Sequence, residues 1–469
     1  MSTPAPAPGA TDFWTLDRVA AALHDVLRGA VPRGEEPLRA VSTDTRAVTS
    51  GDLFVALVGD RFDAHDFLPN AVDKGAAALV VSDARRAAGL GVPVYEVSDT
   101  LVALGRLGRY WRRAWGGTIV GVAGSNGKTS TKELLKAALG AARRVSATSG
   151  NLNNLVGVPL TLLAIPPETE IAIVEMGTNM PGEIARLRAI AEPSVTVMTS
   201  IGEEHLEGLG DLAGVLREES DAFDDVELAV VPADQPEVAE AAAGRARRVV
   251  RAGLDDGDLK TERWSIGGDG AGTLLVDGVE VRPAVRGVHN LRNTMLALAV
   301  ARALGVSLED AARGVAGMPQ PSMRSAWSQL GGVTLINDAY NANPGSTRAA
   351  LDLLVHAGNG RQRVAVLGTM RELGAHGDRL HEEIARRALD AGIEVVAGVG
   401  DFADALERVA PRDARVVTAR EVEALWPLLE PRVSSDAVIL LKASRGVALE
   451  RIVPSLERWA GGEPASQHV

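Results

Sequence analysis

The sequence predicts an α/β fold in which parallel sheets are covered by helices. Short apolar runs rich in Val and Ile alternate along the chain with helical patterns of ten or more residues, which is typical of parallel strands joined by helices. The 469 residues exceed what one hydrophobic core serves, so several domains are expected. A glycine-rich loop joins one apolar run directly to a helix, as in nucleotide-binding parallel sheets.

The apolar runs are too short for helices and are therefore assigned as buried strands. The expected strands include Ala77–Val81, Thr118–Val122, Ile171–Val174, Val195–Met198, Val364–Leu367 and Val438–Leu441. The expected helices include Lys128–Gly140, Asn290–Gly305, Arg379–Gly392 and Asp401–Ala410.

Two glycine and proline signals predict the domain boundaries. Gly116 and Gly117 precede the strand at Thr118, and Pro319 and Pro321 interrupt helical continuity after an Ala-rich helix. We therefore expect three domains: a smaller N-terminal α/β domain over residues 1–116, a central mononucleotide-binding domain of the P-loop type over 117–321, and a C-terminal Rossmann-like α/β domain over 322–469. Residues 1–10, rich in Ala and Pro, are expected to form a frayed tail.

Charge and composition exclude several classes of function. The formal charge of 49 − 61 = −12 disfavours broad binding to nucleic acid or to an anionic membrane. The absence of cysteine excludes disulfides, thiolate metal sites and cysteine nucleophiles. The sequence has no signal peptide and no apolar run long enough to span a membrane, so a cytoplasmic protein is expected. Without a coiled-coil pattern, we expect a monomer.

The strand at Thr118 leads into a loop suited to phosphate. Its glycines let backbone N–H groups approach phosphate oxygens, and the following helix presents its positive end to the same anion. Lys128 can reach the outer phosphates of a nucleotide, and the hydroxyl of Thr129 suits a Mg²⁺ ligand. The alternative is a glycine turn of purely structural origin. Lys132 and Lys136 continue the helical face and are expected to be solvated, although Lys132 lies near enough to the helix start to assist Lys128. The loop candidates are Gly121, Gly124, Ser125, Asn126, Gly127, Lys128, Thr129 and Ser130.

The loop Gly-Val-Ala-Gly-Ser-Asn-Gly-Lys-Thr-Ser resembles the ATP loop of the Mur ligase family, the ATP-dependent amide-bond ligases of peptidoglycan assembly. Further blocks occur in the order found in that family and extend the resemblance over nearly the whole chain. They are Thr148–Leu163, Glu175–Gly177, Thr199–Gly210, Gly287–Asn293 and Ile336–Ser346.

The C-terminal blocks resemble one branch of this family. Asn-Asp-Ala-Tyr-Asn-Ala-Asn-Pro at Asn337–Pro344, with Val366–Gly374, is similar to the branch that adds D-alanyl-D-alanine to UDP-N-acetylmuramoyl-tripeptide. The block Ser42–Arg46 is similar to the uridine-nucleotide-binding domain of the same branch. The resemblance implies an acyl-phosphate intermediate and a requirement for ATP and Mg²⁺. Two alternatives are a sibling, either another Mur ligase or a folylpolyglutamate-type ligase, and a non-catalytic paralogue that binds nucleotide.

The resemblance also implies roles for individual residues. Glu175 and His205 match ligands of a second Mg²⁺, although a histidine alone at this position could be a surface residue. Asn290 and Asn293 match positions near the adenine, Arg324 matches one near the phosphates, and Asp338 matches one near the ribose. The alternative for Asn290 is a helix N-cap, and both roles could hold at once. Lys442, Ser444 and Arg445 match an anion-binding turn that faces the acceptor peptide, or form a solvated turn. The remaining substrate candidates are Thr45, Arg46, Asn151, Asn153, Asn154, Asn341 and Asn343.

The sequence departs from the family at one metal ligand. Members typically carry a lysine, carbamylated to a carboxylate that binds the second Mg²⁺, about fourteen residues after the motif histidine. Here no lysine lies between Lys136 and Lys260, and Glu219 occupies that place. We expect Glu219 to supply an encoded carboxylate, since Mg²⁺ prefers hard oxygen ligands. Glu218 is the second candidate for this ligand, and a solvated Glu219 is the alternative.

Overall fold

In a computed structural model, the structure describes residues 13–59 and 61–461 and divides into two compact units. The first comprises Met1–Val122, Arg143–Thr178 and Gly182–Thr196, and the second comprises Ala123–Ala142, Asn179–Pro181 and Val197–Val469. The predicted α/β class is confirmed in both units, whereas the division into three domains stays a prediction. The predicted tail, residues 1–10, lies outside the described residues.

The N-terminal part of the first unit is a mostly parallel five-stranded sheet. Its strand order is β2-β7-β6-β5-β4, with only β2 antiparallel to its neighbour. Alternate residues of β5 point to opposite faces: Leu53 and Val55 join one hydrophobic cluster and Phe54 joins the other. The elements are β1 (Trp14–Thr15), α1 (Leu16–Ala22), β2 (Leu27–Arg28), β3 (Pro37–Leu38), β4 (Val41–Ser42), β5 (Leu53–Val55), η1 (Ala64–Phe67), α2 (Leu68–Asp73), β6 (Ala78–Val81), η2 (Ala84–Ala87) and β7 (Val94–Val97).

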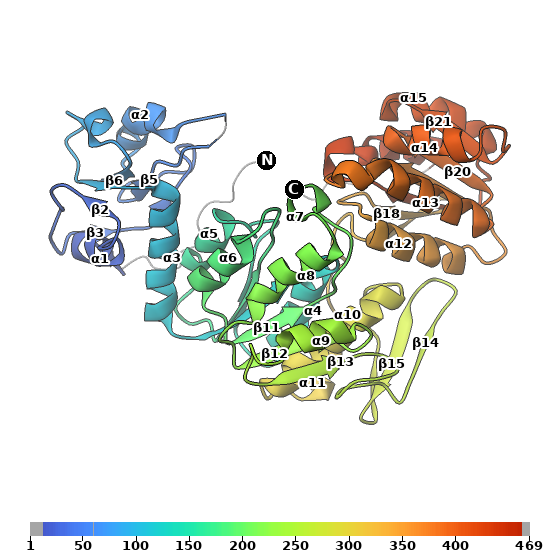
Figure 1. Cartoon of the computed structure of the whole chain (residues 1–469), viewed down its shortest axis with the longest axis horizontal. Coiled ribbons are helices and arrows are strands. Elements are labelled where there is room, and N and C mark those ends of the chain that lie inside the picture. Colours follow the sequence, from blue (N-terminus) through green and yellow to red (C-terminus); the bar gives the residue numbers. More distant parts are fainter. Residues whose placement is uncertain (1–12, 60, 462–469) are drawn as a thin grey trace. The chain divides into compact units, whose positions relative to one another are not determined.

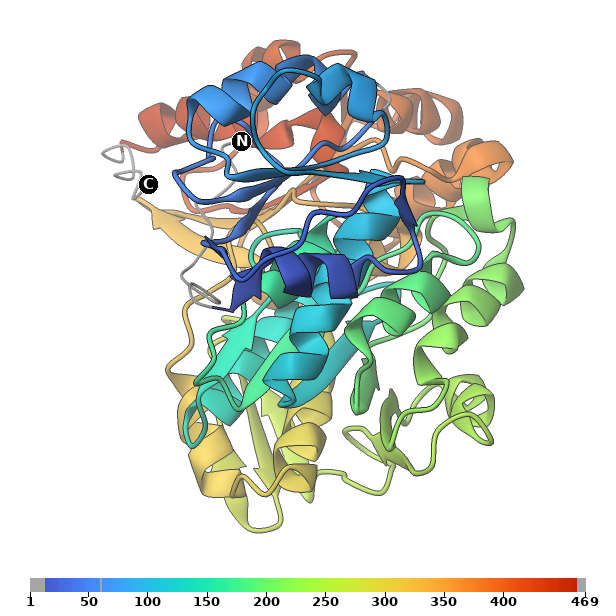
Figure 2. The same ribbon diagram turned by 90° about the vertical axis from the view of Figure 1, so that its left-hand side faces the viewer.

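The long helix α3 (Thr100–Trp115) connects this sheet with the rest of the first unit, as Figures 1 and 2 show. Gly108 lets α3 approach α5 closely, because a Cβ there would lie 2.9 Å from Cα of Pro159. Beyond α3, strands β9, β10 and β8 run parallel in that order. Their elements are β8 (Thr118–Ala123), β9 (Val145–Ala147), α5 (Gly157–Leu163), β10 (Ile171–Glu175) and α6 (Glu183–Ala191); β11 (Val195–Met198) passes from the first unit into the second.

The second unit begins at the carboxyl end of β8 and contains the helix that follows the glycine loop. This helix, α4, packs against α10 and α11, and β12 pairs in parallel with β13. A three-stranded antiparallel sheet precedes α10. The elements are α4 (Lys128–Gly140), α7 (Leu206–Leu209), α8 (Leu212–Ser220), η3 (Asp221–Phe223), β12 (Leu228–Pro232), α9 (Pro236–Ala242), β13 (Val249–Ala252), β14 (Arg263–Ile266), β15 (Gly272–Val276), β16 (Val279–Val281), α10 (Val288–Ala303) and α11 (Leu308–Ala316).

The C-terminal part of the second unit is a six-stranded sheet of order β17-β18-β22-β19-β20-β21. Only β17 is antiparallel to its neighbour. The elements are β17 (Ala326–Leu330), β18 (Val333–Asp338), α12 (Pro344–Ala357), β19 (Arg363–Gly368), η4 (Gly374–His376), α13 (Gly377–Asp390), β20 (Val395–Val399), α14 (Asp401–Val409), β21 (Val416–Ala419), α15 (Val422–Leu429), η5 (Glu430–Arg432), β22 (Val438–Lys442), η6 (Arg445–Val447), η7 (Leu449–Ile452) and α16 (Val453–Trp459).

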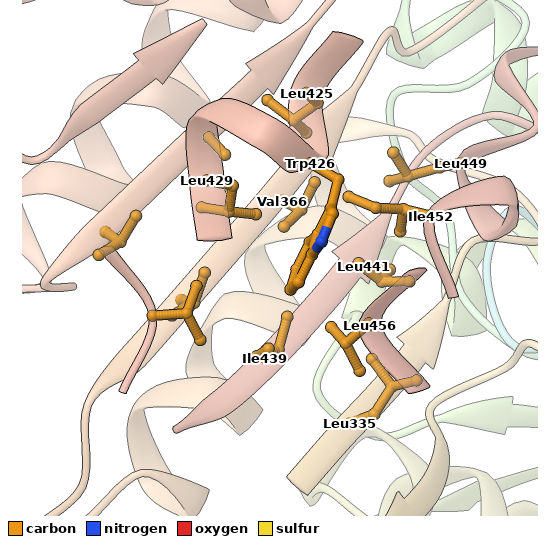
Figure 3. Packing of buried hydrophobic residues seen from close by; sticks show 14 of the residues in the cluster. Leu335, Val366, Leu425, Trp426, Leu429, Ile439, Leu441, Leu449, Ile452 and Leu456 are labelled. Atoms are coloured by element: carbon orange, nitrogen blue, oxygen red, sulfur yellow. The ribbon is translucent and has the colours of Figure 1, made fainter. Parts of the chain in front are cut away.

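Trp426 of α15 lies at the centre of the core on one face of this sheet. Figure 3 shows its indole among Ile439 and Leu441 of β22 and side chains from η7 and α16. Replacing a buried Trp by Ala removes contact area and leaves a cavity, which costs about 3–5 kcal/mol. We expect Trp426→Ala to lower the free energy of unfolding by that amount in a urea titration. Leu428→Ala, on the same helix but 51% exposed, is the matched control and is expected to change it little; equal losses would contradict this packing argument.

Among the described residues, no helix combines the length and the apolar character required to span a membrane.

Candidate active site

The predicted phosphate loop connects the end of β8 to the first turn of α4. Gly124 and Gly127 both have left-handed backbones, with φ of 111° and 87°. A Cβ on Gly124 would lie 2.7 Å from Oγ1 of Thr199, so this turn requires glycine. Gly127 precedes α4 and has no side chain that could cap the first N–H groups of the helix. The loop therefore presents the N-terminal end of a 13-residue helix, which favours an anion.

Gly121 lies within β8 rather than in the loop. A Cβ there would come within 2.8 Å of Cε of Met176, so its small size is required by packing inside the first unit. Ser125 instead belongs to the turn itself: its Oγ accepts a hydrogen bond from N of Gly202 at 2.9 Å. Ser130, in the first turn of α4, is buried.

Lys128 points back across the loop that precedes it. Its Nζ contacts the carbonyl oxygen of Gly124, lies 3.3 Å from the carbonyl oxygen of Ser125, and lies 3.6 Å from Oε1 of Glu204. The ammonium is therefore held where a phosphate at the helix end would meet it. Lys132 is only 2% exposed, so the expectation that it is solvated was wrong; Lys136 is exposed as expected.

Glu219 is fully buried beneath the loop. Its Oε2 accepts a hydrogen bond from N of Gly124 at 2.8 Å, while Oε1 has no hydrogen-bond partner among the described residues. Burial raises the pKa of Glu219 to about 7, and the nearby Lys128 only partly opposes this rise. The alternative of a solvated side chain is excluded. Glu218, the second candidate for the metal ligand, is also buried, at 6% exposure.

Glu204 is a further buried carboxylate that the sequence analysis missed. It is 5% exposed, and its Oε1, which faces Lys128, has no hydrogen-bond partner in the part of the chain that the structure describes. Burial raises the pKa of Glu204, opposed by Lys128 and His205. Its position directly before the motif histidine was the signal that could have identified it.

His205 is the N-cap residue of α7 and has a left-handed backbone, φ 51°. Its Nδ1 contacts Oε2 of Glu372, and its Nε2 lies 3.7 Å from Oε2 of Glu204. Burial would lower the pKa of His205, but the hydrogen bond to Glu372 and the charge of Glu204 outweigh burial and raise it. The side chain is 17% exposed, so it is not an ordinary surface histidine.

Glu175 belongs to the first unit and ends β10. Its partner in the parallel ladder is Val122 of β8, so Glu175 lies at the carboxyl edge from which the loop starts. It is 2% exposed, and its Oε1 accepts a hydrogen bond from Nδ2 of Asn153 at 2.9 Å. The structure thus gives Asn153, predicted as a substrate contact, a role in orienting Glu175.

The residues predicted to contact the nucleotide gather around two elements of the second unit. Asn290 and Asn293 lie on α10, and a Cβ on Gly127 would approach Nδ2 of Asn293 to 2.8 Å, so Asn293 contacts the loop directly. The helix N-cap is Gly287, which makes the capping alternative for Asn290 wrong; its Nδ2 instead donates to the carbonyl oxygen of Arg286. Asp338 ends β18 and pairs with Lys442 at 2.6 Å.

Arg324 and the C-terminal turn lie near this last pair. The guanidinium of Arg324 stacks 4.1 Å from the ring centroid of Tyr340. Lys442 is 4% exposed and also donates to the carbonyl oxygen of Asn341, so the alternative of a solvated turn does not hold for this residue. Ser444 accepts from N of Arg371, and Arg445 contacts Glu450.

The other substrate candidates are distributed over both units. In the first unit Thr45 is half-buried, exposed Arg46 pairs with Asp44 at 2.7 Å, Asn151 is exposed, and Oδ1 of Asn154 accepts from N of Gly157. In the second unit Asn343 caps α12, and its Nδ2 donates to Oδ1 of Asn126 in the phosphate loop at 2.8 Å.

Within the described residues, no group of three or more His, Cys, Asp or Glu side chains is arranged to hold a metal ion. Of the predicted ligands, Glu175 belongs to the first unit, and Thr129, His205 and Glu219 belong to the second. The set therefore stays a prediction. The buried Oε1 of Glu219, which lacks a hydrogen-bond partner, is an oxygen donor of the kind that Mg²⁺ prefers.

We expect His289, at the start of α10, to make the free energy of unfolding depend on pH in the acid range. Burial, together with the nearby Lys442 and Arg292 charges, outweighs the attraction of Asp338 and lowers the pKa of His289 to about 4. The unfolded chain takes up this proton near pH 6.5, so the stabilisation is complete above 6.5 and is lost as the pH falls towards 4. Because part of the side chain is exposed, we expect a loss of about 1–2 kcal/mol. The measurement is the free energy of unfolding, from urea titrations between pH 6.5 and pH 4. His289→Gln should lack this loss, whereas His24→Gln, at an exposed position, should show the same loss as the unchanged protein.

Comparison with known proteins gives matches over almost the whole chain. Residues 37–112 match the model described as Mur ligase family, catalytic domain; residues 122–301 match the Mur ligase middle domain; and residues 323–445 match the Mur ligase, glutamate ligase domain.

Curated relatives and solved structures agree with these matches. The chain is 33% identical to UDP-N-acetylmuramoyl-tripeptide--D-alanyl-D-alanine ligase of Bacillus subtilis, over 94% of this chain and 98% of that protein. For the Escherichia coli ligase of the same name the identity is 34%, over 93% and 97%. A crystal structure of MurF from Acinetobacter baumannii superposes with a TM-score of 0.86 at 30% identity, covering 95% of this chain and 99% of that chain. MurF from Thermotoga maritima, in complex with ADP, gives 0.79 at 28% identity, covering 90% and 98%.

Three successive family matches and relatives that align from end to end leave one assignment: the chain belongs to the Mur ligase family of ATP-dependent peptide ligases.

Proposed function

We propose that the chain joins D-alanyl-D-alanine to UDP-N-acetylmuramoyl-tripeptide at the expense of ATP, in the cytoplasmic stage of peptidoglycan synthesis. The observation that carries this proposal is the end-to-end similarity, at 33–34% identity, to ligases named for that reaction. The phosphate loop and its buried charges support a catalytic protein rather than a non-catalytic paralogue, because Lys128, Glu204, His205 and Glu219 are all placed around one loop.

The second unit supplies the groups that would bind ATP. The positive end of α4 and the ammonium of Lys128 favour the phosphate chain, and Asn293 lies against Gly127 at the same loop. Lys128 is held by carbonyl oxygens and by Glu204, so little reorganisation is needed before it meets phosphate. Asn290, Arg324 and Asp338 are proposed as the remaining nucleotide contacts.

The reaction brings two anions together. The terminal carboxylate of the UDP-linked peptide attacks the γ-phosphorus of ATP, a P–O bond forms, and ADP leaves. The amine of D-alanyl-D-alanine then attacks the acyl carbon, the C–O bond to phosphate breaks, and the amine loses a proton as the amide forms. Lys128 lowers the repulsion between carboxylate and triphosphate, and the helix end holds the phosphates in place.

Magnesium fits the donor set of this chain. When bound, Mg²⁺ would neutralise charge on the phosphates and on the attacking carboxylate. Thr129 is proposed to bind one Mg²⁺, and Glu175, His205 and Glu219 are proposed to bind a second Mg²⁺. The buried Oε1 of Glu219, without a hydrogen-bond partner among the described residues, is the observation that supports this assignment.

Phosphate release tests the proposed function. The purified protein is given ATP, Mg²⁺, UDP-N-acetylmuramoyl-tripeptide and D-alanyl-D-alanine, and each component is omitted in turn. We expect release only when all are present, with one amide product formed per phosphate. Turnover with a folate and glutamate instead would favour a folylpolyglutamate-type ligase, and nucleotide binding without turnover on any acceptor would favour a non-catalytic paralogue.

A further inference from the structure

The loop that carries His205 is held by a segment far away in the sequence. The backbone N–H of Glu207 donates to the carbonyl oxygen of Glu372 at 3.2 Å, and Nδ1 of His205 contacts Oε2 of the same residue. Gly374, with φ 52°, lets the two segments approach, because a Cβ there would lie 3.2 Å from Cα of Glu207. One glutamate thus binds the histidine loop through both its backbone and its side chain.

Both partners of this contact have strained backbones. His205 and Glu372 are non-glycine residues with left-handed φ angles of 51° and 64°. Such conformations are unfavourable for residues with a Cβ and persist where the surrounding structure holds them, commonly at functional sites. Here each of two strained residues, 167 positions apart, directs its side chain at the other.

The hydrogen bond to Glu372 determines which ring nitrogen of His205 can bind a cation. A carboxylate can only accept, so Nδ1–H of His205 donates to Glu372, and Nε2 becomes the nitrogen that can bind a cation. Nε2 lies 3.7 Å from Oε2 of Glu204, which is beyond hydrogen-bond distance. A carboxylate behind a metal-binding histidine fixes its tautomer and its orientation.

We propose that Glu372 is the positioning residue of His205, so that a divalent cation finds its imidazole ligand in place only when the segment around Glu372 is docked on the His205 loop. The inference rests on the proposed role of His205 as a metal ligand. Because Glu372 lies in the segment matched by the glutamate ligase domain and His205 in the segment matched by the middle domain, docking of the two couples cation affinity to their association.

A second contact between the same segments provides a matched control. Arg348 of α12 pairs with Glu203 at 3.2 Å, two residues before His205, without touching the imidazole. Arg348→Gln therefore removes this ion pair but leaves Glu372 in contact with the imidazole. Glu372→Ala removes the acceptor for Nδ1–H and keeps the ion pair of Arg348. Glu372→Gln keeps an oxygen that can accept the same hydrogen bond, and it tests the role even if the Ala variant folds poorly.

The experiment measures the Mg²⁺ dependence of phosphate release and, independently of activity, the binding of Mn²⁺ by electron paramagnetic resonance in the presence of ADP. We expect Glu372→Ala to raise the cation concentration for half-maximal activity, and the Mn²⁺ dissociation constant, about 10–100-fold. The KM for ATP at saturating Mg²⁺ should change little. Glu372→Gln should have an intermediate effect, and Arg348→Gln should leave cation affinity unchanged.

Nitrogen-15 NMR of the imidazole, assigned with His205→Asn, gives the spectroscopic signature. At alkaline pH the unchanged protein should show the Nδ1–H tautomer for His205, and Glu372→Ala should show a mixture. The inference would be overturned if Glu372→Ala left the cation affinity unaltered, or if Arg348→Gln lowered the cation affinity as much as Glu372→Ala does. If His205→Ala also leaves cation affinity unaltered, the proposed ligand role fails; if His205→Ala lowers affinity and Glu372→Ala does not, only the present inference fails.

Discussion

Glu219→Ala is expected to lower kcat/KM for amide formation about 100–1,000-fold. Glu219 is fully buried, and its carboxylate accepts a hydrogen bond from N of Gly124 in the phosphate loop. Its other carboxylate oxygen has no hydrogen-bond partner among the described residues. Removing it deletes an oxygen ligand from the proposed Mg²⁺ site and leaves N of Gly124 without its acceptor. Single-turnover phosphate release with a constant concentration of Mg²⁺ measures the effect.

Glu218→Ala is the matched control, since Glu218 is the preceding buried carboxylate on α8. We expect it to retain most activity. If Glu218→Ala is inactive while Glu219→Ala is active, the ligand assignment moves to Glu218; full activity in both variants would refute an encoded carboxylate at this place.

Because residue 219 is a glutamate, we also expect the activity of the protein to be independent of bicarbonate. A carbamylated lysine needs dissolved carbon dioxide, whereas Glu219 carries its carboxylate in the sequence. The unchanged protein should therefore keep its activity after bicarbonate is removed. Glu219→Lys should be nearly inactive without bicarbonate and should regain part of its activity when bicarbonate is added. Loss of activity of the unchanged protein on removal of bicarbonate would contradict this expectation.

Lys128→Met is the second change with a large expected effect, a loss of about 100–1,000-fold in kcat/KM. The ammonium is held by two loop carbonyl oxygens and by Glu204 at the N-terminal end of α4, where a phosphate chain would bind. Methionine keeps the length of the side chain but removes the charge that offsets repulsion between the substrate carboxylate and ATP. Steady-state phosphate release against ATP concentration separates KM from kcat.

Lys136→Met removes an exposed lysine two turns further along the same helix and serves as the control. It is expected to match the unchanged protein in KM and kcat. Lys128→Arg tests whether charge suffices: the guanidinium is planar and larger than an ammonium, so a partial loss of kcat is expected. Unimpaired activity in Lys128→Met would show that phosphate is bound elsewhere.

Local pattern was sufficient for the elements and for the loop. The strand at Thr118, the helix Lys128–Gly140 and the strand Val195–Met198 occur within one residue of their expected bounds. Buried parallel strands are short, apolar and β-branched, and these properties are readable in a single run of residues. The turns at Gly124 and Gly127 could be predicted from local sequence too, since their left-handed backbones favour glycine.

Contacts between segments that are distant in the sequence could not be predicted from local pattern. Lys132 was expected to be solvated because its helical neighbours are polar, yet α4 is covered by α10 and α11, which follow more than a hundred residues later. Asn290 was a reasonable helix cap by residue type, but the helix begins at Val288 and the amide binds Arg286 instead.

The sequence by itself determined the α/β class and the family, and it predicted the phosphate loop and the place of Glu219, because each of these depends on residue type and local spacing. Only the tertiary structure decided that Glu219 is buried against Gly124, that Glu204 faces Lys128, and that Glu372 binds His205 from 167 residues away. The physical reason is that burial and charge pairing depend on which segments meet in space, and no local pattern specifies the partner.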